Sequence, residues 1–408
     1  MRVLFTTPIL EHPAAGGPQL RIENSIKALS RVSDVDIIFR TSDTPEMIEG
    51  TSRFFRKYAS EYHVLSRYSP SRTGFAAYCM TLIEKVGNRL FDTRIASHGE
   101  YILSHIKRRQ IDVLWFGYGN ISYPLIRYIK VRRPDLKVVC DTDSVWSRFV
   151  LRELPYVKGF RKLRISRTGR KKELEERAWV NLCDVTTAVS EVDAEYYRSI
   201  ANDKKSIHIF SNVIDIDSYK LTHASPPNFK TPSIYLAGSF GHYNSPMDTA
   251  ARWVLDDVFP KVLKKYPTVH FYIVGRNSEL GFGHLNGPNI TVTGRLESVL
   301  PYLCNTDVAL VPLKFESGTR FKILEAGACR IPLVSTVLGA EGIPVINGEH
   351  ILLADEPEHF AAAIIKLLDD REFANRLASN CYDLVNENFS VESLAAEASQ
   401  ILGYLNRD

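Results

Sequence analysis

Residues 308–325 read Val-Ala-Leu-Val-Pro-Leu-Lys-Phe-Glu-Ser-Gly-Thr-Arg-Phe-Lys-Ile-Leu-Glu. The first four are apolar, which predicts a strand covered on both faces, and the proline ends it. A helical pattern follows from Arg320 to Cys329, and we expect the hydroxyl of Ser317 or Thr319 to cap that helix. A strand, a glycine-bearing loop and a helix in this order are typical of α/β domains with parallel sheets.

The loop and the start of the helix predict an anion-binding site. Free N–H groups at a helix N-terminus and the helix dipole attract negative charge. Arg320 and Lys322 add two cations there, and the combination suits a diphosphate. Glu325 lies farther into the helix, and its carboxylate suits a ribose diol because it accepts two hydroxyl protons. An exposed i,i+3 ion pair between Lys322 and Glu325, worth about 0.2–0.5 kcal/mol, explains the same two residues.

Short apolar runs alternate with amphipathic stretches along the rest of the chain, which predicts parallel sheets flanked by helices. In the first half the expected strands are Val3–Thr6, Val35–Phe39, Val113–Phe116, Lys137–Cys140, Val185–Val189 and Ile207–Phe210. In the second half they are Ser233–Ala237, His270–Val274, Ile290–Thr293, Val308–Val311, Ile331–Ser335 and His350–Leu353. The length of 408 residues exceeds one ordinary core. We therefore predict two Rossmann-like doubly wound α/β domains that face each other across a ligand-binding cleft.

The proposed domain boundaries follow proline-bearing segments. Residues 1–220 are predicted to form an N-terminal domain that binds the acceptor, and residues 221–232, which hold two prolines in a row, a linker. Residues 233–385 are predicted to form the second domain. Residues 386–408 are expected to hold an amphipathic helix over Val391–Leu405, with packing back onto the N-terminal domain as one possibility.

The segment from Ser317 to Thr336 resembles the signature of group 1 retaining glycosyltransferases (glycosyltransferase family 4), which have the GT-B fold. The match rests on Leu324-Glu-Ala326 and Ile331-Pro-Leu-Val-Ser-Thr336. In that family two glutamates stand eight residues apart, and here the first position holds Ser317. The resemblance implies that Glu325 binds the nucleotide ribose. It also implies that Ser317, Gly318 and Thr319 lie beside the donor sugar, where the family's first glutamate is missing.

Further segments resemble family landmarks in the same order. They are the turn Ala237-Gly-Ser-Phe-Gly-His-Tyr-Asn-Ser-Pro246, the strand end Val274-Gly-Arg276, the segment Gly294-Arg-Leu296 and the loop with Gly16 and Gly17. The implied donor-binding residues are Gly16, Gly17, Gly238, Ser239, Tyr243, Arg276, Arg295 and Leu296. Ordinary strand–helix turns explain the glycines equally well. His12, near the first loop, is predicted to be a solvated loop residue.

Cys140-Asp-Thr-Asp143 follows another expected strand. Many members of the family place a histidine near here, facing the donor sugar, and Asp143 holds that position. Asp141 and Asp143 either bind sugar or acceptor hydroxyls or cap the turn at Trp146. Together with Arg320 and Lys322, Asp143 completes the set of catalytic candidates. The Asp-x-Asp spelling lies in the wrong fold context for a metal, so no metal site is predicted.

The resemblance implies transfer of a sugar from a nucleotide-diphosphate sugar to a hydroxyl of a glycan or lipid-linked acceptor, with retention of configuration. The acceptor attacks from the front face, and the leaving diphosphate helps to take its proton. Cell-surface polysaccharide synthesis is the expected setting, with no cofactor besides the donor. Two alternatives remain: a sugar-nucleotide epimerase of the same fold, and a non-catalytic nucleotide-sugar binder.

The charge distribution points to one further partner. The net charge of +4 is too small to indicate nucleic acid. Residues 148–172, however, hold ten basic residues against one acid, Glu153, with aromatic and aliphatic residues between them. The segment is either a peripheral contact with an anionic membrane or a solvated helix whose charges pair with nearby glutamates.

The predicted location is the cytoplasm, with peripheral attachment to the inner membrane face as one possibility. The opening residues look like a strand rather than a signal peptide. Six cysteines, with no CxxC pair, are predicted to be small buried hydrophobic residues in a reducing compartment. They are Cys79, Cys140, Cys183, Cys304, Cys329 and Cys381.

Overall fold

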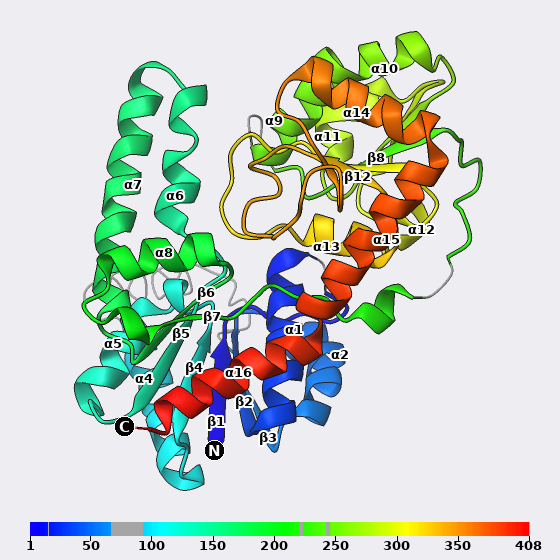
Figure 1. Ribbon diagram of the computed structural model, residues 1–408. Helices are drawn as coiled ribbons and strands as arrows, with labels where there is room; N and C mark the ends of the chain where they lie inside the picture. The colour runs from blue at the N-terminus through cyan, green and yellow to red at the C-terminus, as the bar shows by residue number, and fades with distance from the viewer. Residues whose placement is uncertain (15, 67–92, 221–222, 242–244, 408) are drawn as a thin grey trace, which may run out of the picture. The chain divides into compact units, whose positions relative to one another are not determined.

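The computed structural model describes residues 1–14, 16–66, 93–220, 223–241 and 245–407. The chain divides into two compact units (Figure 1). The first unit comprises Met1–Asp143, Lys171–Ser211 and Leu394–Asp408. The second unit comprises Ser144–Arg170 and Asn212–Ser393. Residues 144–170, which include most of the basic segment, group with the second unit instead of the proposed N-terminal domain. The last helix groups with the first unit, which is the possibility raised above for residues 386–408.

A seven-stranded parallel sheet forms the centre of the first unit. In spatial order its strands are β3 (Glu61–Ser66), β2 (Asp34–Thr41), β1 (Arg2–Thr7), β4 (Val113–Gly117), β5 (Lys137–Asp141), β6 (Val185–Ala188) and β7 (Ile207–Ile209). Phe5 of β1 stands beside Ile37 of β2 and Trp115 of β4, and all three are fully buried or nearly so. The strand order reverses between β1 and β4, which is where doubly wound sheets bind ligands.

Helices flank this sheet (Figure 1). They are α1 (Gly17–Val32), α2 (Pro45–Phe55), α4 (Thr93–Arg109), α5 (Tyr123–Arg132), the later part of α7 (Gly159–Val180), α8 (Glu191–Ile200) and the C-terminal α16 (Val391–Leu405). Glu397 of α16 accepts hydrogen bonds from the backbone N–H of Ser211, at 2.7 Å, and from its hydroxyl, at 2.8 Å. These bonds fix the last helix to the chain segment that follows β7.

A six-stranded parallel sheet forms the centre of the second unit. Its spatial order is β10 (Ile290–Val292), β9 (His270–Val274), β8 (Ser233–Ala237), β11 (Val308–Val311), β12 (Leu333–Ser335) and β13 (Leu352–Leu353). The helices are α6 (Trp146–Leu151), α9 (Pro246–Trp253), α10 (Phe259–Lys265), α11 (Ser278–Phe282), α12 (Leu300–Leu303), α13 (Phe321–Ala328), α14 (Pro357–Asp369) and α15 (Arg371–Asn388). The order reverses between β8 and β11, so the loops after these strands share one edge of the sheet.

The predicted α/β class and doubly wound sheets are confirmed, and all twelve expected strands are present. The sequence reading missed β3, because Glu61-Tyr-His-Val-Leu-Ser66 mixes charged and apolar residues on an edge strand. The helix expected over Val391–Leu405 has the same bounds in the structure.

Candidate functional site

Glycines bring the backbone close together at the carboxyl edge of the second sheet. Gly275 follows β9 and has a positive φ of 125°, and a Cβ atom there would overlap the carbonyl oxygen of Gly238, which follows β8. Gly238 N–H donates to Val274 O at 3.0 Å, and Gly275 N–H donates to Gly294 O at 3.2 Å. Three successive strand ends thus pack backbone against backbone, and at Gly275 only glycine satisfies both the conformation and the space.

The predicted donor-binding residues around these turns differ in exposure. The guanidinium Nε of Arg276 donates to Ser239 Oγ at 3.4 Å, so these two residues lie side by side. Arg295 is exposed and Leu296 is half-buried. Tyr243 lies outside the described residues. The loops after β8, β9 and β10 therefore present two arginines and a serine at one edge of the sheet.

The loop from Ser317 to Arg320 follows β11, at the switch point. The Oγ of Ser317 is buried and has no hydrogen-bond partner among the described residues. Gly318 has a φ of 83°, and Thr319 Oγ1 accepts a 2.8 Å hydrogen bond from the side-chain amide of Asn212. Arg320 is 4% exposed, with its Nε 3.6 Å from a carboxylate oxygen of Glu316. Buried polar groups without a partner are rare in native proteins, so the Ser317 hydroxyl is available to a ligand.

The predicted helix cap is wrong. Helix α13 begins at Phe321, its N-cap residue is Arg320, and no side chain caps it. The hydroxyl of Thr319 is engaged by Asn212 instead, and Ser317 lies outside the capping position. Within the described part of the chain the first N–H groups of α13 consequently have no side-chain acceptor, as an anion site at a helix N-terminus requires.

Glu325 projects from the middle of α13 toward a residue that the sequence did not single out. The hydroxyl of Tyr219 donates to Glu325 Oε1 at 3.0 Å. Burial raises the pKa of the Glu325 carboxyl, while the Tyr219 hydrogen bond and the charge of Lys322 oppose that rise. In the described chain Lys322 acts on Glu325 only through its charge, without an ion pair within 4.0 Å, and the carboxylate is hydrogen-bonded by Tyr219, so the hypothesis of an exposed i,i+3 pair is wrong.

Asn212 and Tyr219 are additions that only the structure supplies. Asn212 belongs to Ser211-Asn-Val-Ile-Asp215, a segment whose pattern indicates a structural role, and it reaches a loop 107 residues away. Tyr219 precedes the expected linker, and no motif marks it. Contacts over such sequence separations are set by strand order and are invisible to local patterns.

In the first unit, the loop after β1 leads into α1. Gly16 is the N-cap of α1 in an extended conformation, and a Cβ atom added there would lie 3.6 Å from its nearest neighbour. The chain's own packing therefore does not require glycine at this position. His12 is not the solvated residue expected, because its Nδ1 lies 3.0 Å from Glu23 Oε2 and its ring stacks on Phe54 at 3.4 Å.

The two aspartates after β5 differ in burial and in their partners. Asp141 is fully buried, paired with Arg21 and hydrogen-bonded by Thr187 at 2.8 Å, so it is removed from any sugar site. Asp143 is half-buried and accepts a hydrogen bond from Asn120 at 3.1 Å. The N-cap residue of α6 is Val145, and Asp141 is engaged elsewhere, so among the two aspartates only Asp143 stays a candidate for capping the turn at Trp146 or for binding a hydroxyl.

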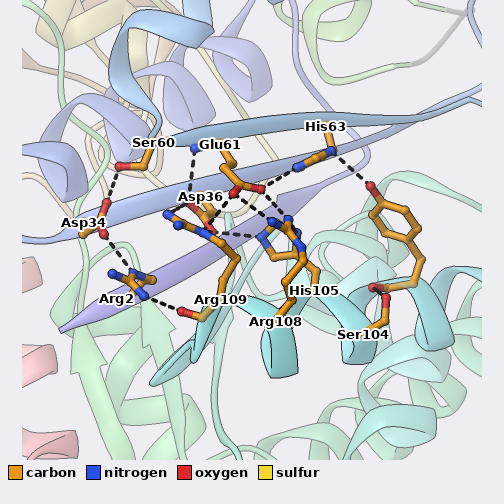
Figure 2. A network of polar contacts seen from close by, with 11 residues as sticks. Arg2, Asp34, Asp36, Ser60, Glu61, His63, Ser104, His105, Arg108 and Arg109 are labelled. Carbon is orange, nitrogen blue, oxygen red and sulfur yellow. Dashed lines mark hydrogen bonds and ion pairs between the residues drawn. The ribbon is translucent and has the colours of Figure 1, made fainter.

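A third polar cluster lies at the amino-terminal ends of β2 and β3, opposite the edge just described (Figure 2). Glu61, His63 and His105 stand close enough together to hold a metal ion. Arg108 binds Glu61 with both terminal nitrogens and lowers the pKa of that carboxyl to about 2, with a further hydrogen bond from His63. Both ring nitrogens of His63 and His105 already have partners. The cluster is thus a network of ion pairs that fixes α4 to the sheet.

The basic segment forms α6, a short turn and α7. Part of the segment agrees with the alternative of a solvated helix whose basic residues pair with glutamates. Arg161 pairs with Glu153, and Lys171 and Lys172 pair with Glu175. Arg152 binds both carboxylate oxygens of Glu341 at 2.8 Å, which anchors α6 to the second unit. Four large apolar side chains along the segment are exposed: Phe149, Tyr156, Phe160 and Leu163. Among the described residues, no helix has the length and apolar character needed to cross a bilayer.

Residues 232–370 of the second unit match the family model described as Glycosyl transferases group 1. This domain of the chain is therefore similar to the group 1 glycosyl transferases. The resemblance seen around Glu325 is thereby confirmed for this domain, which contains the β8, β9 and β11 loops and α13.

One curated relative matches part of the chain. An uncharacterized 44.6 kDa protein in the cps region of Klebsiella pneumoniae is 24% identical over 147 residues, 34% of this chain and 38% of that protein. The match thus spans less than half the length of the curated relative.

Solved structures resemble the whole chain. HepE of Anabaena, in complex with UDP and glucose, has a TM-score of 0.63 at 13% identity, covering 99% of this chain and 100% of that one. Sucrose-phosphate synthase from Thermosynechococcus elongatus has a TM-score of 0.69 at 16% identity, covering 100% of both chains. WaaG, a glycosyltransferase involved in lipopolysaccharide biosynthesis, has a TM-score of 0.61 at 15% identity, with coverage of 98% and 99%. The chain therefore has the predicted GT-B fold, with one parallel sheet in each unit.

Proposed function

We propose that this protein is a retaining glycosyltransferase that moves a sugar from a nucleotide-diphosphate sugar to a hydroxyl of a glycan or lipid-linked acceptor. The observation that carries the proposal is the β11–α13 junction of the glycosyl transferase domain. It combines an uncapped helix N-terminus, a buried Ser317 hydroxyl without a partner among the described residues and the Glu325 carboxylate. These groups match the phosphate, sugar and ribose of one donor molecule.

In this proposal each part of the donor has its own partner. The N–H groups at the start of α13, with Arg320 and Lys322, bind the diphosphate. Glu325 accepts the ribose hydroxyl protons. The Ser317 hydroxyl and the backbone around Gly318 contact the sugar. UDP sugars are the first donors to test, because HepE was solved in complexes with UDP and with UDP-glucose.

The proposed chemistry needs no covalent enzyme intermediate. The acceptor hydroxyl attacks the anomeric carbon on the face that the diphosphate leaves, and a phosphate oxygen takes the hydroxyl proton. The bond from the anomeric carbon to the phosphate oxygen breaks as the bond to the acceptor oxygen forms. Arg320, Lys322 and the α13 amides stabilise the negative charge that develops on the diphosphate. Asp143, held by Asn120, is the candidate partner for a sugar or acceptor hydroxyl in the first unit.

The proposed setting is cell-surface polysaccharide synthesis at a membrane. The match to a protein in a cps region and the likeness to WaaG support it. In the basic segment, Phe160 is 82% exposed and Leu163 is 47% exposed. Several exposed cations surround them: Lys158, Lys162, Arg164, Arg167 and Arg170. Apolar side chains among cations fit an anionic lipid surface, at about 1 kcal/mol per cation near the surface.

The donor site is tested by binding. Affinities for UDP, GDP and ADP sugars are ranked by thermal shift and measured by calorimetry for the best donor. Glu325→Ala and Lys322→Ala are expected to weaken binding by roughly tenfold or more, the loss of about 1.5–3 kcal/mol from a charged hydrogen bond. Exposed residues supply matched controls, Glu387→Ala on α15 and Lys264→Ala on α10. Unchanged affinity in both site variants, with the fold intact, would refute the donor site.

The reaction class is tested with a radiolabelled donor. Transfer to an acceptor with the anomeric configuration of the donor, read by NMR, supports retention. Conversion of the sugar without acceptor identifies an epimerase. Donor binding with neither transfer nor slow donor hydrolysis identifies a non-catalytic binder.

For the membrane contact, sedimentation with anionic and neutral vesicles at low salt compares the wild-type protein with the double variant Phe160→Ser/Leu163→Ser. If the wild-type protein does not bind anionic vesicles, the proposed membrane contact is refuted.

A further inference from the structure

Two cysteine thiols lie together beside the Glu325 helix. Cys304 follows α12 and Cys329 is the C-cap residue of α13, and their Sγ atoms are 3.5 Å apart. Both residues are partly exposed, so the expectation of burial is wrong for this pair, whereas Cys140, Cys183 and Cys381 are buried as predicted. Cys79 lies outside the described residues. Their partial exposure distinguishes this pair from Cys140 and Cys183, which are also in contact but are both buried, because a thiol must be accessible to react.

We propose that Cys304 and Cys329 form a reversible disulfide that changes the affinity of the site on α13. Closing the bond requires the two sulfur atoms to approach from 3.5 Å to about 2.05 Å. Side-chain rotation and a small shift of the C-terminal end of α13 accomplish this. The two residues are 25 positions apart, so the bond closes a loop that contains β11, the whole 312–320 loop and helix α13.

The environment of the pair favours attack by Cys304. The hydrogen bond between the thiols lowers the pKa of Cys304, with burial opposing it. The same hydrogen bond, burial and nearby negative charges, including that of Glu325, raise the pKa of Cys329. Cys304 therefore ionises first and is the nucleophile, since the thiolate is the reactive form.

The oxidant is a low-molecular-weight disulfide, such as oxidised glutathione. The Cys304 thiolate attacks one of its sulfur atoms, a mixed disulfide forms, and one glutathione thiolate leaves. Cys329 then loses its proton to water and attacks the Cys304 sulfur, releasing the second glutathione thiolate. The two cysteines lose two electrons and the oxidant gains them. Excess reduced glutathione reverses both steps.

The disulfide acts on the proposed donor site through α13, and this consequence rests on the proposed function. The backbone N–H of Cys329 donates to Glu325 O at 3.0 Å, one helical turn away. Moving Cys329 toward Cys304 therefore displaces the turn that carries Glu325. A displacement on the scale of 1 Å at a binding group costs up to about 100-fold, and we expect roughly tenfold weaker nucleotide binding in the oxidised protein.

The crosslink is tested on the full-length protein in buffers of increasing oxidised-to-reduced glutathione ratio. The expected product has lost two hydrogen atoms by intact mass, and digestion yields one peptide pair joined through Cys304 and Cys329. Cys304→Ser and Cys329→Ser must each abolish that pair, and Cys304→Ala repeats the test if a serine destabilises the fold. The buried Cys140 and Cys183 serve as internal controls that stay reduced. Glutathione adducts that persist without closure, or no modification at Cys304, overturn the proposal.

The regulatory consequence is tested by calorimetry with UDP on the reduced and oxidised protein. Regulation is supported if oxidation weakens UDP binding, if reduction restores the affinity, and if Cys304→Ser shows no such change. Equal affinity in the crosslinked and reduced forms refutes regulation. If the reduced protein binds no nucleotide, the proposed function fails and the regulatory consequence fails with it, while the crosslink is decided by mass alone.

Discussion

The hydroxyl of Tyr219 donates a 3.0 Å hydrogen bond to Oε1 of Glu325, across 106 residues of sequence. The bond occupies one carboxylate oxygen and fixes the plane of the group. Burial raises the pKa of Tyr219 well above its usual range, with the nearby Glu325 charge adding to the effect, so the phenol remains a donor at neutral pH. Tyr219 is therefore a positioning residue for the carboxylate that the proposed function places on the ribose.

Tyr219→Phe is expected to weaken nucleotide binding by about threefold to tenfold, because the carboxylate loses its orientation and one charge-assisted bond. The effect should be smaller than that of Glu325→Ala, which removes the carboxylate itself. Calorimetry with the best donor measures both. Tyr266→Phe is the matched control, since its hydroxyl also bonds a carboxylate, Asp369, on the exposed surface. Equal effects of the two tyrosine variants contradict the positioning role.

Glu325 also predicts a pH dependence of stability. Burial raises the pKa of its carboxyl above the ordinary value of 4.5. The folded protein then retains a proton that the unfolded chain has released, so the residue lowers stability as pH rises through the window between the two pKa values. As pH rises through that window, the free energy of unfolding of the wild type should fall relative to that of Glu325→Gln. At higher pH the difference between the two proteins should stay constant. Urea unfolding of the wild type and of Glu325→Gln from about pH 4 to 8 measures the difference.

Gly275→Ala is expected to disrupt the carboxyl edge of the second sheet, where the proposed donor site lies. The residue has a φ of 125°, and its Cβ would overlap the Gly238 carbonyl oxygen. Backbone strain alone costs roughly 1–3 kcal/mol, and the overlap adds to it. Gly403→Ala on α16 meets no atom within 4 Å and should stabilise by up to about 1 kcal/mol. Thermal unfolding compares them, and a Gly275→Ala protein as stable as the wild type is the contrary result.

The ion-pair network in Figure 2 predicts a large effect of Asp36→Asn. The carboxylate is fully buried, 2.9 Å from His105 and 3.0 Å from Arg109. Burial raises its pKa, but hydrogen bonds from His105 and Arg109 more than offset this and lower it below 3.8. Removing one partner from a buried pair costs about 3–5 kcal/mol. The stability from Asp36 should persist above pH 3.8 and disappear as pH falls through the lowered pKa.

The same network gives a test with metal. Because Arg108 and Arg109 already form ion pairs with Glu61, added zinc should not raise the melting temperature of the wild type. A saturable rise at one equivalent, lost in His63→Ala, would show that the cluster binds metal after all.

The sequence by itself determined the strands, the doubly wound class and the strand–loop–helix order around Ser317 to Glu325. These features are local: apolar runs of strand length, a glycine loop and a motif with fixed spacing. Sequence reading failed where a side chain's partner lies far along the chain. The sequence offers Asp141 as a sugar ligand, but in the folded sheet Arg21 and Thr187 bind its carboxylate. The sequence offers Thr319 as a helix cap, but its hydroxyl accepts a hydrogen bond from Asn212.

Tertiary structure alone decided which groups meet. The strand order of the second sheet brings the β8 and β11 loops to one edge, and the chain before β8 brings Tyr219 to Glu325. It also set two cysteines in contact that the sequence treated as separate. Hydrogen bonds and thiol contacts act over about 3–4 Å, a distance that sequence spacing specifies within a helix or turn but not between elements.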